Sequence, residues 1–303
     1  MYADSLKQKS FFGLILYGAR PKTLVASFFP VILGMILARF DGHYNIAIYL
    51  YTLFAAMFLQ IGANYANDFF DNKAERDTIN RLGPPRLASS GLLSKEMILT
   101  LTITFFLVAT ILTIPLIQQG GNIIFYLLVF GIFLGVCYSF GRYSLANTGL
   151  SNIVVFIVFG PLSTMMTYYL QTFDYSLKAA FFGILPGALS LMLFAMNNLR
   201  DLEEDKKSNK KTLVVRFGFW CGKMEYTASL FLALLLPPLS MMLYKAPMIT
   251  LLPLILIKMG MNLSMEIHGA KDSLAIIPLF EKTAKFNTLY ALLYIIGWRL
   301  ASL

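Results

Sequence analysis

Long stretches without any charged residue are the feature that most restricts how this chain can fold. No Asp, Glu, Lys or Arg occurs in residues 97–141, 143–173 or 179–199. Apolar runs of about 20 residues cross a bilayer as helices, because a helix satisfies its own backbone hydrogen bonds in lipid. The first of these runs is long enough for two such helices. The chain is therefore predicted to be a polytopic membrane protein.

About nine spans fit the whole pattern, and they form one all-α bundle over residues 1–303. Turn-forming sequences such as Asp41-Gly42 and Asn147-Thr148-Gly149 separate them. The short apolar stretch from Phe11 to Arg20 is predicted to be an interfacial helix. The predicted spans are residues 23–39, 46–66, 97–117, 122–141, 151–171, 178–199, 226–244, 247–266 and 285–302.

Basic residues are distributed unequally between the two sides of these spans, and this predicts the orientation. With the N-terminus in the cytoplasm, 20 of the 25 Lys and Arg residues fall on the cytoplasmic side and four on the opposite side. Such an excess is typical of cytoplasmic loops. The net charge of +9 is therefore attributed to topology, and no nucleic-acid partner or obligate protein partner is expected.

The scarce charges concentrate in residues 67–95 and 200–225, which hold 21 of the 41 charged residues and lie on the predicted cytoplasmic side. At or just before the start of each segment, polar residues are spaced four apart, a step that keeps side chains on one helical face. Asp68 lies beside the first row. The rows are Asn67, Asp71 and Glu75, and Asn197, Asp201 and Asp205.

Stacked carboxylates repel one another, so two such rows at corresponding helix ends suggest a shared counter-ion. Mg²⁺ is typically held by one or two carboxylates together with substrate phosphates, and Asn adds a neutral oxygen or a donor. A single row could equally be a solvated loop whose acids pair with nearby Lys and Arg. The repeated spacing favours a Mg²⁺-diphosphate site at Asn67, Asp68, Asp71, Asn197, Asp201 and Asp205.

Basic residues on the same side are candidates for phosphate contacts, with Arg suited to bidentate binding and Lys acting as a point charge. Tyr138 and Arg142, four apart at the end of the fourth span, are the favoured pair. Lys258 and Glu266 lie eight apart on the same general face of the eighth span. Intramembrane charges are functional by default, but snorkelling is an equal alternative here, and neither residue is assigned a role.

The paired acidic motifs resemble those of the UbiA-type intramembrane aromatic prenyltransferases. Further strings between residues 19 and about 218 resemble its MenA branch, the 1,4-dihydroxy-2-naphthoate polyprenyltransferases. These strings are Ala19-Arg20-Pro21-Lys22-Thr23-Leu24, Asn64-x-x-Asn67-Asp68-x-x-Asp71 with Asp77-Thr78, Gly83-Pro84-x-Arg86, Phe159-Gly160-Pro161, and Asn197-Asn198-x-Arg200-Asp201-x-Glu203-Glu204-Asp205. The sequence departs from the branch at Glu75, where Gly is usual, and at Leu150-Ser151-Asn152, where Glu is common. Arg142 replaces the Lys of the wider family.

The resemblance implies Mg²⁺-dependent transfer of a polyprenyl group from polyprenyl diphosphate to 1,4-dihydroxy-2-naphthoate, giving demethylmenaquinone. It implies helices around a central cavity with a cytoplasmic cap, in a bacterial cytoplasmic (inner) membrane, with membrane lipid around them. The acidic motifs would lie at residues 64–78 and 197–212, and Asp77 joins the metal ligands. Catalysis would depend on Asn67, Asp68, Asp71, Asp201 and Asp205, and substrate binding on Arg20, Lys22, Asn64, Arg86, Tyr138, Arg142, Arg200 and Lys211.

Other functions remain open at this point. Within the same family, 4-hydroxybenzoate, homogentisate and haem are possible acceptors. A transporter of anionic or phosphorylated solutes would place its charges near the bilayer midplane, whereas these charges gather at one surface. Phosphoalcohol transfer from a nucleotide-diphosphate lipid normally uses one contiguous acidic motif, and this chain has two.

Overall fold

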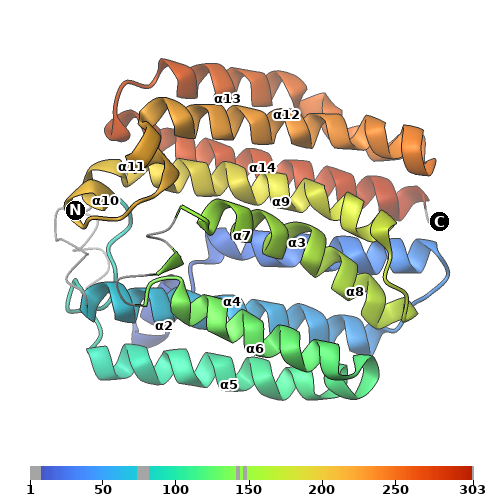
Figure 1. The fold of residues 1–303 in the computed structure, drawn as a ribbon, viewed down its shortest axis with the longest axis horizontal. Coiled ribbons are helices and arrows are strands. Elements are labelled where there is room, and N and C mark those ends of the chain that lie inside the picture. Colours follow the sequence, from blue (N-terminus) through green and yellow to red (C-terminus); the bar gives the residue numbers. More distant parts are fainter. Residues whose placement is uncertain (1–7, 74–81, 141–143, 146–148, 302–303) are drawn as a thin grey trace.

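The computed structural model describes residues 8–73, 82–140, 144–145 and 149–301, with all of their regular structure helical. Most helices run side by side along the long axis of the molecule (Figure 1). In chain order the elements are α2 (Phe11–Gly18), α3 (Pro21–Phe40), α4 (Ile46–Lys73), α5 (Lys95–Gly120), α6 (Asn122–Cys137), α7 (Ser151–Ile157), the π-helical turn η2 (Val158–Leu162), α8 (Ser163–Thr172), α9 (Leu177–Arg200), α10 (Leu202–Lys207), α11 (Leu213–Phe217), α12 (Phe219–Tyr244), the 3₁₀ helix η3 (Met248–Leu256), α13 (Ile257–Gly269) and α14 (Ser273–Ala301).

Seven helical segments of the described chain are long and apolar enough to cross a membrane by length and composition. They correspond to seven of the nine predicted spans. The remaining two predictions fall on α6, which has 16 residues, and on the 29-residue α14. The predicted all-α polytopic fold is therefore confirmed. The seven segments are Thr23–Phe40, Ile46–Lys73, Lys95–Gly120, Ser151–Thr172, Leu177–Arg200, Phe219–Tyr244 and Met248–Gly269.

Helix α2 is too short to span a membrane and has the exposed apolar face of an interfacial helix. Ser10 caps its first turn by accepting a hydrogen bond from the Gly13 N–H at 3.2 Å. Phe12 is 73% exposed, and Phe11 and Leu16 are also exposed. Such a helix is stable where its apolar face meets lipid at the headgroup boundary.

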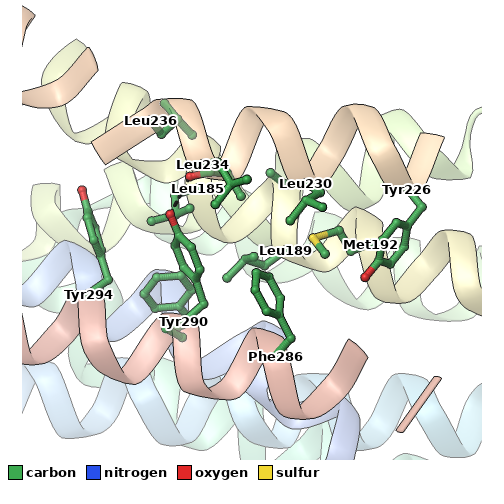
Figure 2. Close-up of a cluster of buried hydrophobic side chains, with 14 of the residues drawn as sticks. Leu185, Leu189, Met192, Tyr226, Leu230, Leu234, Leu236, Phe286, Tyr290 and Tyr294 are labelled. Carbon is green, nitrogen blue, oxygen red and sulfur yellow. Dashed lines mark hydrogen bonds between the residues drawn. The ribbon is translucent and has the colours of Figure 1, made fainter. Parts of the chain in front are cut away.

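The main core lies where α9, α12 and α14 meet. Figure 2 shows side chains from these three helices pointing toward one another, with Leu189, Leu230 and Phe286 among them. Two polar groups in this core donate to backbone carbonyls: the Tyr290 hydroxyl donates to the Ala233 carbonyl at 2.8 Å, and the Asn287 side-chain N–H donates to the Leu189 carbonyl at 2.7 Å. Satisfying these groups avoids the cost of burying them unpaired.

The broken fifth span approaches α9 backbone to backbone. Its π-helical turn contains Gly160, at φ −134° and ψ −109°, followed by Pro161. A Cβ atom added at Gly183 would lie 2.6 Å from the Pro161 Cα, and one at Gly187 would lie 2.7 Å from the Phe156 carbonyl oxygen. Only glycine permits contacts this close, so the two segments are packed without intervening side chains.

The carboxyl ends of α4 and α9 lie at the same end of the bundle, at the left of Figure 1, beside α10 and α11. The connection between α13 and α14 lies there too. The Ser273 hydroxyl donates to the Leu199 carbonyl at 2.8 Å, and the Lys223 ammonium donates to the Ala270 carbonyl at 2.6 Å. The fold therefore brings both acidic motifs to one end of the molecule.

Candidate active site

The end of α4 is enclosed by the segment that follows it in the described chain, residues 82–94. Asp68 accepts hydrogen bonds from the backbone N–H groups of Leu87 at 3.0 Å and Ala88 at 3.4 Å. Asp71 forms a salt bridge with Arg86, with 2.7 Å between Oδ2 and Nη2. Arg86 also donates to the Asn67 carbonyl at 2.9 Å. Because Asp71 is 2% and Arg86 8% exposed, this ion pair is buried.

Arg20 occupies the turn between α2 and α3 in a left-handed backbone conformation, with φ +54°. This conformation costs a non-glycine residue roughly 1 kcal/mol, so surrounding contacts have to support it. The Thr23 hydroxyl donates to the Arg20 carbonyl at 2.9 Å, and the Asn64 amide donates to the Ala19 carbonyl at 3.0 Å. Asn64 is 4% exposed and thus positions the turn that carries Arg20.

The second acidic motif differs from its prediction in one respect. A single uninterrupted helix was expected to carry Asn197, Asp201 and Asp205, but α9 ends at Arg200 and Asp201 lies between α9 and α10. The guanidinium of Arg200 folds back over the helix end: it contacts Asp201 at 2.6 and 2.8 Å and donates to Asn197 Oδ1 at 2.9 Å. The helix break therefore coincides with a bidentate ion pair between neighbouring residues.

Asp205 remains close to the expected register across this break. Its backbone N–H donates to the Asp201 carbonyl at 2.8 Å, which is the four-residue step of a helix. Its carboxylate pairs with Lys210 at 3.2 Å and is mostly buried. Arg200 also lies over the ring of Phe280 on α14, 5.3 Å from the ring centroid, in a cation–π contact.

Several contacts connect the two motifs. The Leu82 N–H donates to Glu204 Oε1 at 3.0 Å, which joins the segment after α4 to α10. Tyr138, at the end of α6, lies within the electrostatic influence of four predicted site residues. These residues are Asp71, Asp205, Arg20 and Arg86. The structure thus brings the two acidic motifs, three of the predicted arginines and Tyr138 into one site.

Three predicted site residues lie wholly or partly outside the described part of the chain. Asp77 and Arg142 lie outside the described residues, and so does the side chain of Lys22, the second residue of α3. Lys211 is exposed in the segment between α10 and α11.

The structure also adds residues that sequence patterns did not single out. The Ser139 hydroxyl donates to Asn67 Oδ1 at 3.1 Å and so orients that amide. The Asn152 amide donates to Glu225 on α12. A carboxylate therefore does lie at the start of α7, where the sequence lacks the Glu common in the resembling family, but it comes from another helix. In the sequence, the absence of a Glu at residues 150–152 was the one sign that a carboxylate from elsewhere in the chain could lie there.

The donor set fits Mg²⁺ bound together with a phosphate ligand. Its predicted ligands are carboxylate and amide oxygens, which suit this hard cation. Among the described residues, no three acidic, His or Cys side chains lie close enough to hold a metal ion by themselves. Each motif nevertheless offers one or two buried carboxylates beside a basic side chain, and Mg²⁺ needs no more from protein when phosphates complete its shell.

The fold and site together define a helical membrane protein with paired acidic and basic side chains at one end of its bundle. Comparison with known proteins then gives its family: the chain belongs to the UbiA prenyltransferase family, whose profile matches residues 27–289. It is a polyprenyl transferase. This membership favours prenyl transfer over solute transport and over phosphoalcohol transfer.

Several curated relatives carry the same enzyme name. The chain is 31% identical to the 1,4-dihydroxy-2-naphthoate octaprenyltransferase of Escherichia coli strain K12 over 92% of both chains. It is 32% identical to the enzyme of that name from Mycobacterium tuberculosis, over 71% of this chain and 74% of the relative.

Among solved structures, a UbiA homolog from Aeropyrum pernix K1 without ligand matches with a TM-score of 0.65 at 13% identity, over 89% of this chain and 97% of that one. A UbiA homolog from Archaeoglobus fulgidus, bound to DMAPP and Mg²⁺, matches with a TM-score of 0.59 at 14% identity, over 92% of this chain and 98% of that one. At these identities the likeness shows the shared fold.

Proposed function

We propose that this enzyme transfers a polyprenyl group from polyprenyl diphosphate to 1,4-dihydroxy-2-naphthoate in menaquinone biosynthesis. The names of the curated relatives support this acceptor. The observation that carries the proposal is the convergence of Asp71 and Arg86 with Asp205 and Arg20 around Tyr138. Such a cluster suits a diphosphate, which needs both cationic donors and metal-binding carboxylates.

The reaction breaks the bond between the allylic carbon and the diphosphate oxygen and forms a bond to the ring carbon that bears the acceptor's carboxylate. Carbon dioxide and diphosphate leave. No oxidant takes part, so the direct product is the quinol form of demethylmenaquinone. The solved homolog bound to DMAPP and Mg²⁺ supports the choice of donor substrate and cation.

Mg²⁺ held by Asp68, Asp71, Asp201 and Asp205 together with the diphosphate would neutralise the charge that develops on the leaving group. Arg86 and Arg20 bind diphosphate oxygens and hold the leaving group in place. The Ser139 hydroxyl donates to the side-chain oxygen of Asn67 and so orients its amide. The N–H groups of this amide then face away from Ser139. The site lies at the end of a bundle of apolar helices, and exclusion of water by these helices would protect the allylic cation.

The proposed location is the cytoplasmic side of a bacterial inner membrane, with the prenyl chain remaining in the bilayer. The excess of basic residues on the side of the acidic motifs supports this orientation. Cytoplasmic access suits both the soluble aromatic acid and the charged diphosphate.

The decisive experiment incubates purified enzyme with Mg²⁺, a polyprenyl diphosphate and each candidate acceptor, followed by mass measurement of the product. We expect product from 1,4-dihydroxy-2-naphthoate, and no product from 4-hydroxybenzoate or homogentisate. Asp71→Ala and Asp201→Ala should abolish transfer with membrane insertion intact. Asp174→Ala removes an exposed carboxylate in the connection between α8 and α9 and should retain activity. Substantial transfer by either site variant would refute the role of the acidic motifs.

A further inference from the structure

An open groove lies between α13 and α14, on helices that do not carry the acidic motifs. Its volume is about 540 Å³. Three lysines and one glutamate contribute to its wall, so the groove has an excess of positive charge. The lining residues are Ile255, Lys258, Met259, Asn262, Leu263, Glu266, Lys282 and Lys285.

The charges in the groove are only partly balanced. Glu266 pairs with Lys282 at 2.5 Å, and this pair is half-exposed. Within the part of the chain that the structure describes, no salt bridge joins Lys258 or Lys285 to a carboxylate. Asn262 adds an amide donor to the same wall. Two ammonium groups beside a neutral amide form a setting that attracts an anion with several acceptor oxygens.

The position of the groove indicates that this anion comes from lipid. Lys258 precedes Glu266 by eight residues on α13, about 12 Å along the helix axis at 1.5 Å per residue. The groove therefore extends two turns into a segment long and apolar enough to cross a membrane. Glu266 lies three residues before the end of α13 at Gly269, and the α13–α14 connection that follows lies at the end of the bundle that holds the acidic motifs (Figure 1). A lysine at this depth extends its ammonium toward the headgroup layer.

The walls supply apolar contacts as well as charge. Met259 and Leu263 line the groove itself. The outer face of α13 is also apolar: Ile257 is 45% exposed, Met261 49% and Met265 64%. A free phosphate gains nothing from this surface, whereas a phospholipid can place its phosphate among the lysines and its acyl chains along α13.

We propose that the groove between α13 and α14 binds the phosphate of an anionic phospholipid from the surrounding membrane. Lys258 and Lys285 contact the phosphate, while Glu266 lowers the affinity by holding Lys282 and by repelling the anion. Basic pockets between membrane helices bind such headgroups through this combination of charge and depth. Lys258 and Glu266 thus both set the affinity of this lipid site, a role that is independent of prenyl transfer.

The test measures lipid retention by the purified full-length protein in native mass spectrometry, with dioleoylphosphatidylglycerol and dioleoylphosphatidylcholine as probes. Lys258→Gln/Lys285→Gln should weaken phosphatidylglycerol binding by about tenfold or more, since each lysine contributes to headgroup attraction. Lys95→Gln/Lys271→Gln removes two exposed lysines outside the groove and should leave binding unchanged. Glu266→Gln should strengthen binding several-fold, a gain that a misfolded variant would not show.

Each of the following results would overturn the proposal. Retention of phosphatidylglycerol by the double groove variant at the wild-type level would show that the lysines do not bind it. Equal retention of phosphatidylcholine would show that the anionic headgroup is not selected. Displacement of the lipid by inorganic phosphate would assign the groove to the free anion. Because no arm requires catalysis, the result is independent of the acceptor assay.

Discussion

Replacing Arg86 by Met is expected to destabilise the protein strongly, because it leaves the Asp71 carboxylate buried without its guanidinium partner. At the observed 2.7 Å, two unit charges attract by about 6 kcal/mol at an effective dielectric constant of about 20. Desolvation of both groups offsets part of this, so removal of one partner from a buried pair costs about 3–5 kcal/mol. For a chain of this size we expect a fall in the apparent melting temperature of about 6–12 °C. Circular dichroism of the purified protein in detergent, without substrate, measures this fall.

A double-mutant cycle isolates the contribution of the pair. Arg86→Met with Asp71→Asn should destabilise by about 2 kcal/mol less than the sum of the two single changes, because the double variant buries no unpaired charge. Lys206→Met is the matched control: it breaks a 2.9 Å pair with Glu203 whose side chains are 49% and 61% exposed, and it should cost less than about 1 kcal/mol. Additive single effects, or an Arg86→Met protein that melts like the wild type, would refute the buried ion pair.

Three further predictions concern the metal, the packing and the site. Chelation with EDTA should stop prenyl transfer and leave the apparent melting temperature unchanged, because Asp71, Asp201 and Asp205 already have basic partners in the fold. A large fall in the melting temperature would show instead that the metal is structural. Gly183→Ala should lower the melting temperature by a shift equivalent to about 1–3 kcal/mol, since its Cβ would lie 2.6 Å from the Pro161 Cα. Gly269→Ala is the control and should leave the melting temperature unchanged, because no atom lies within 4 Å of the added Cβ. Ser139→Ala should raise KM for the prenyl diphosphate about fivefold, because it removes the hydrogen bond that orients the Asn67 amide and so weakens binding by about 1 kcal/mol. An unchanged KM would show that Asn67 does not contribute to diphosphate binding.

Local sequence patterns were sufficient to predict the spans and the acidic rows. Hydropathy reports the composition of a helix directly, so the uncharged runs became helices at nearly the predicted bounds. The four-residue spacing of Asn67 and Asp71 held because α4 continues without interruption to Lys73. In the second motif the helix is interrupted at Asp201, and the hydropathy and spacing of the sequence did not predict this interruption.

The partners of the acids depended on tertiary structure. Asp71 pairs with Arg86, fifteen residues further along, because residues 82–94 fold back over α4. The Leu82–Glu204 contact joins positions 122 residues apart, and the Ser139–Asn67 bond joins positions 72 apart. No periodicity links such residues, so their encounter could be found only from the fold. The sequence also allowed a solvated loop whose acids pair with nearby Lys and Arg. That alternative is partly correct, because Asp71 and Asp205 do pair with basic residues, but both carboxylates are buried.

The turn at Arg20 has a consequence for biogenesis. Its supports come from residues made later: Asn64 lies 45 positions after Ala19, and Pro85, which accepts a hydrogen bond from the Tyr17 hydroxyl, lies 68 positions after that tyrosine. The ribosome must therefore complete the second span, and then residue 85, before these bonds can form. A nascent chain that stops before residue 64 already contains Arg20 but lacks the amide that holds its turn, so the amino-terminal edge of the site is assembled only after later segments have entered the membrane.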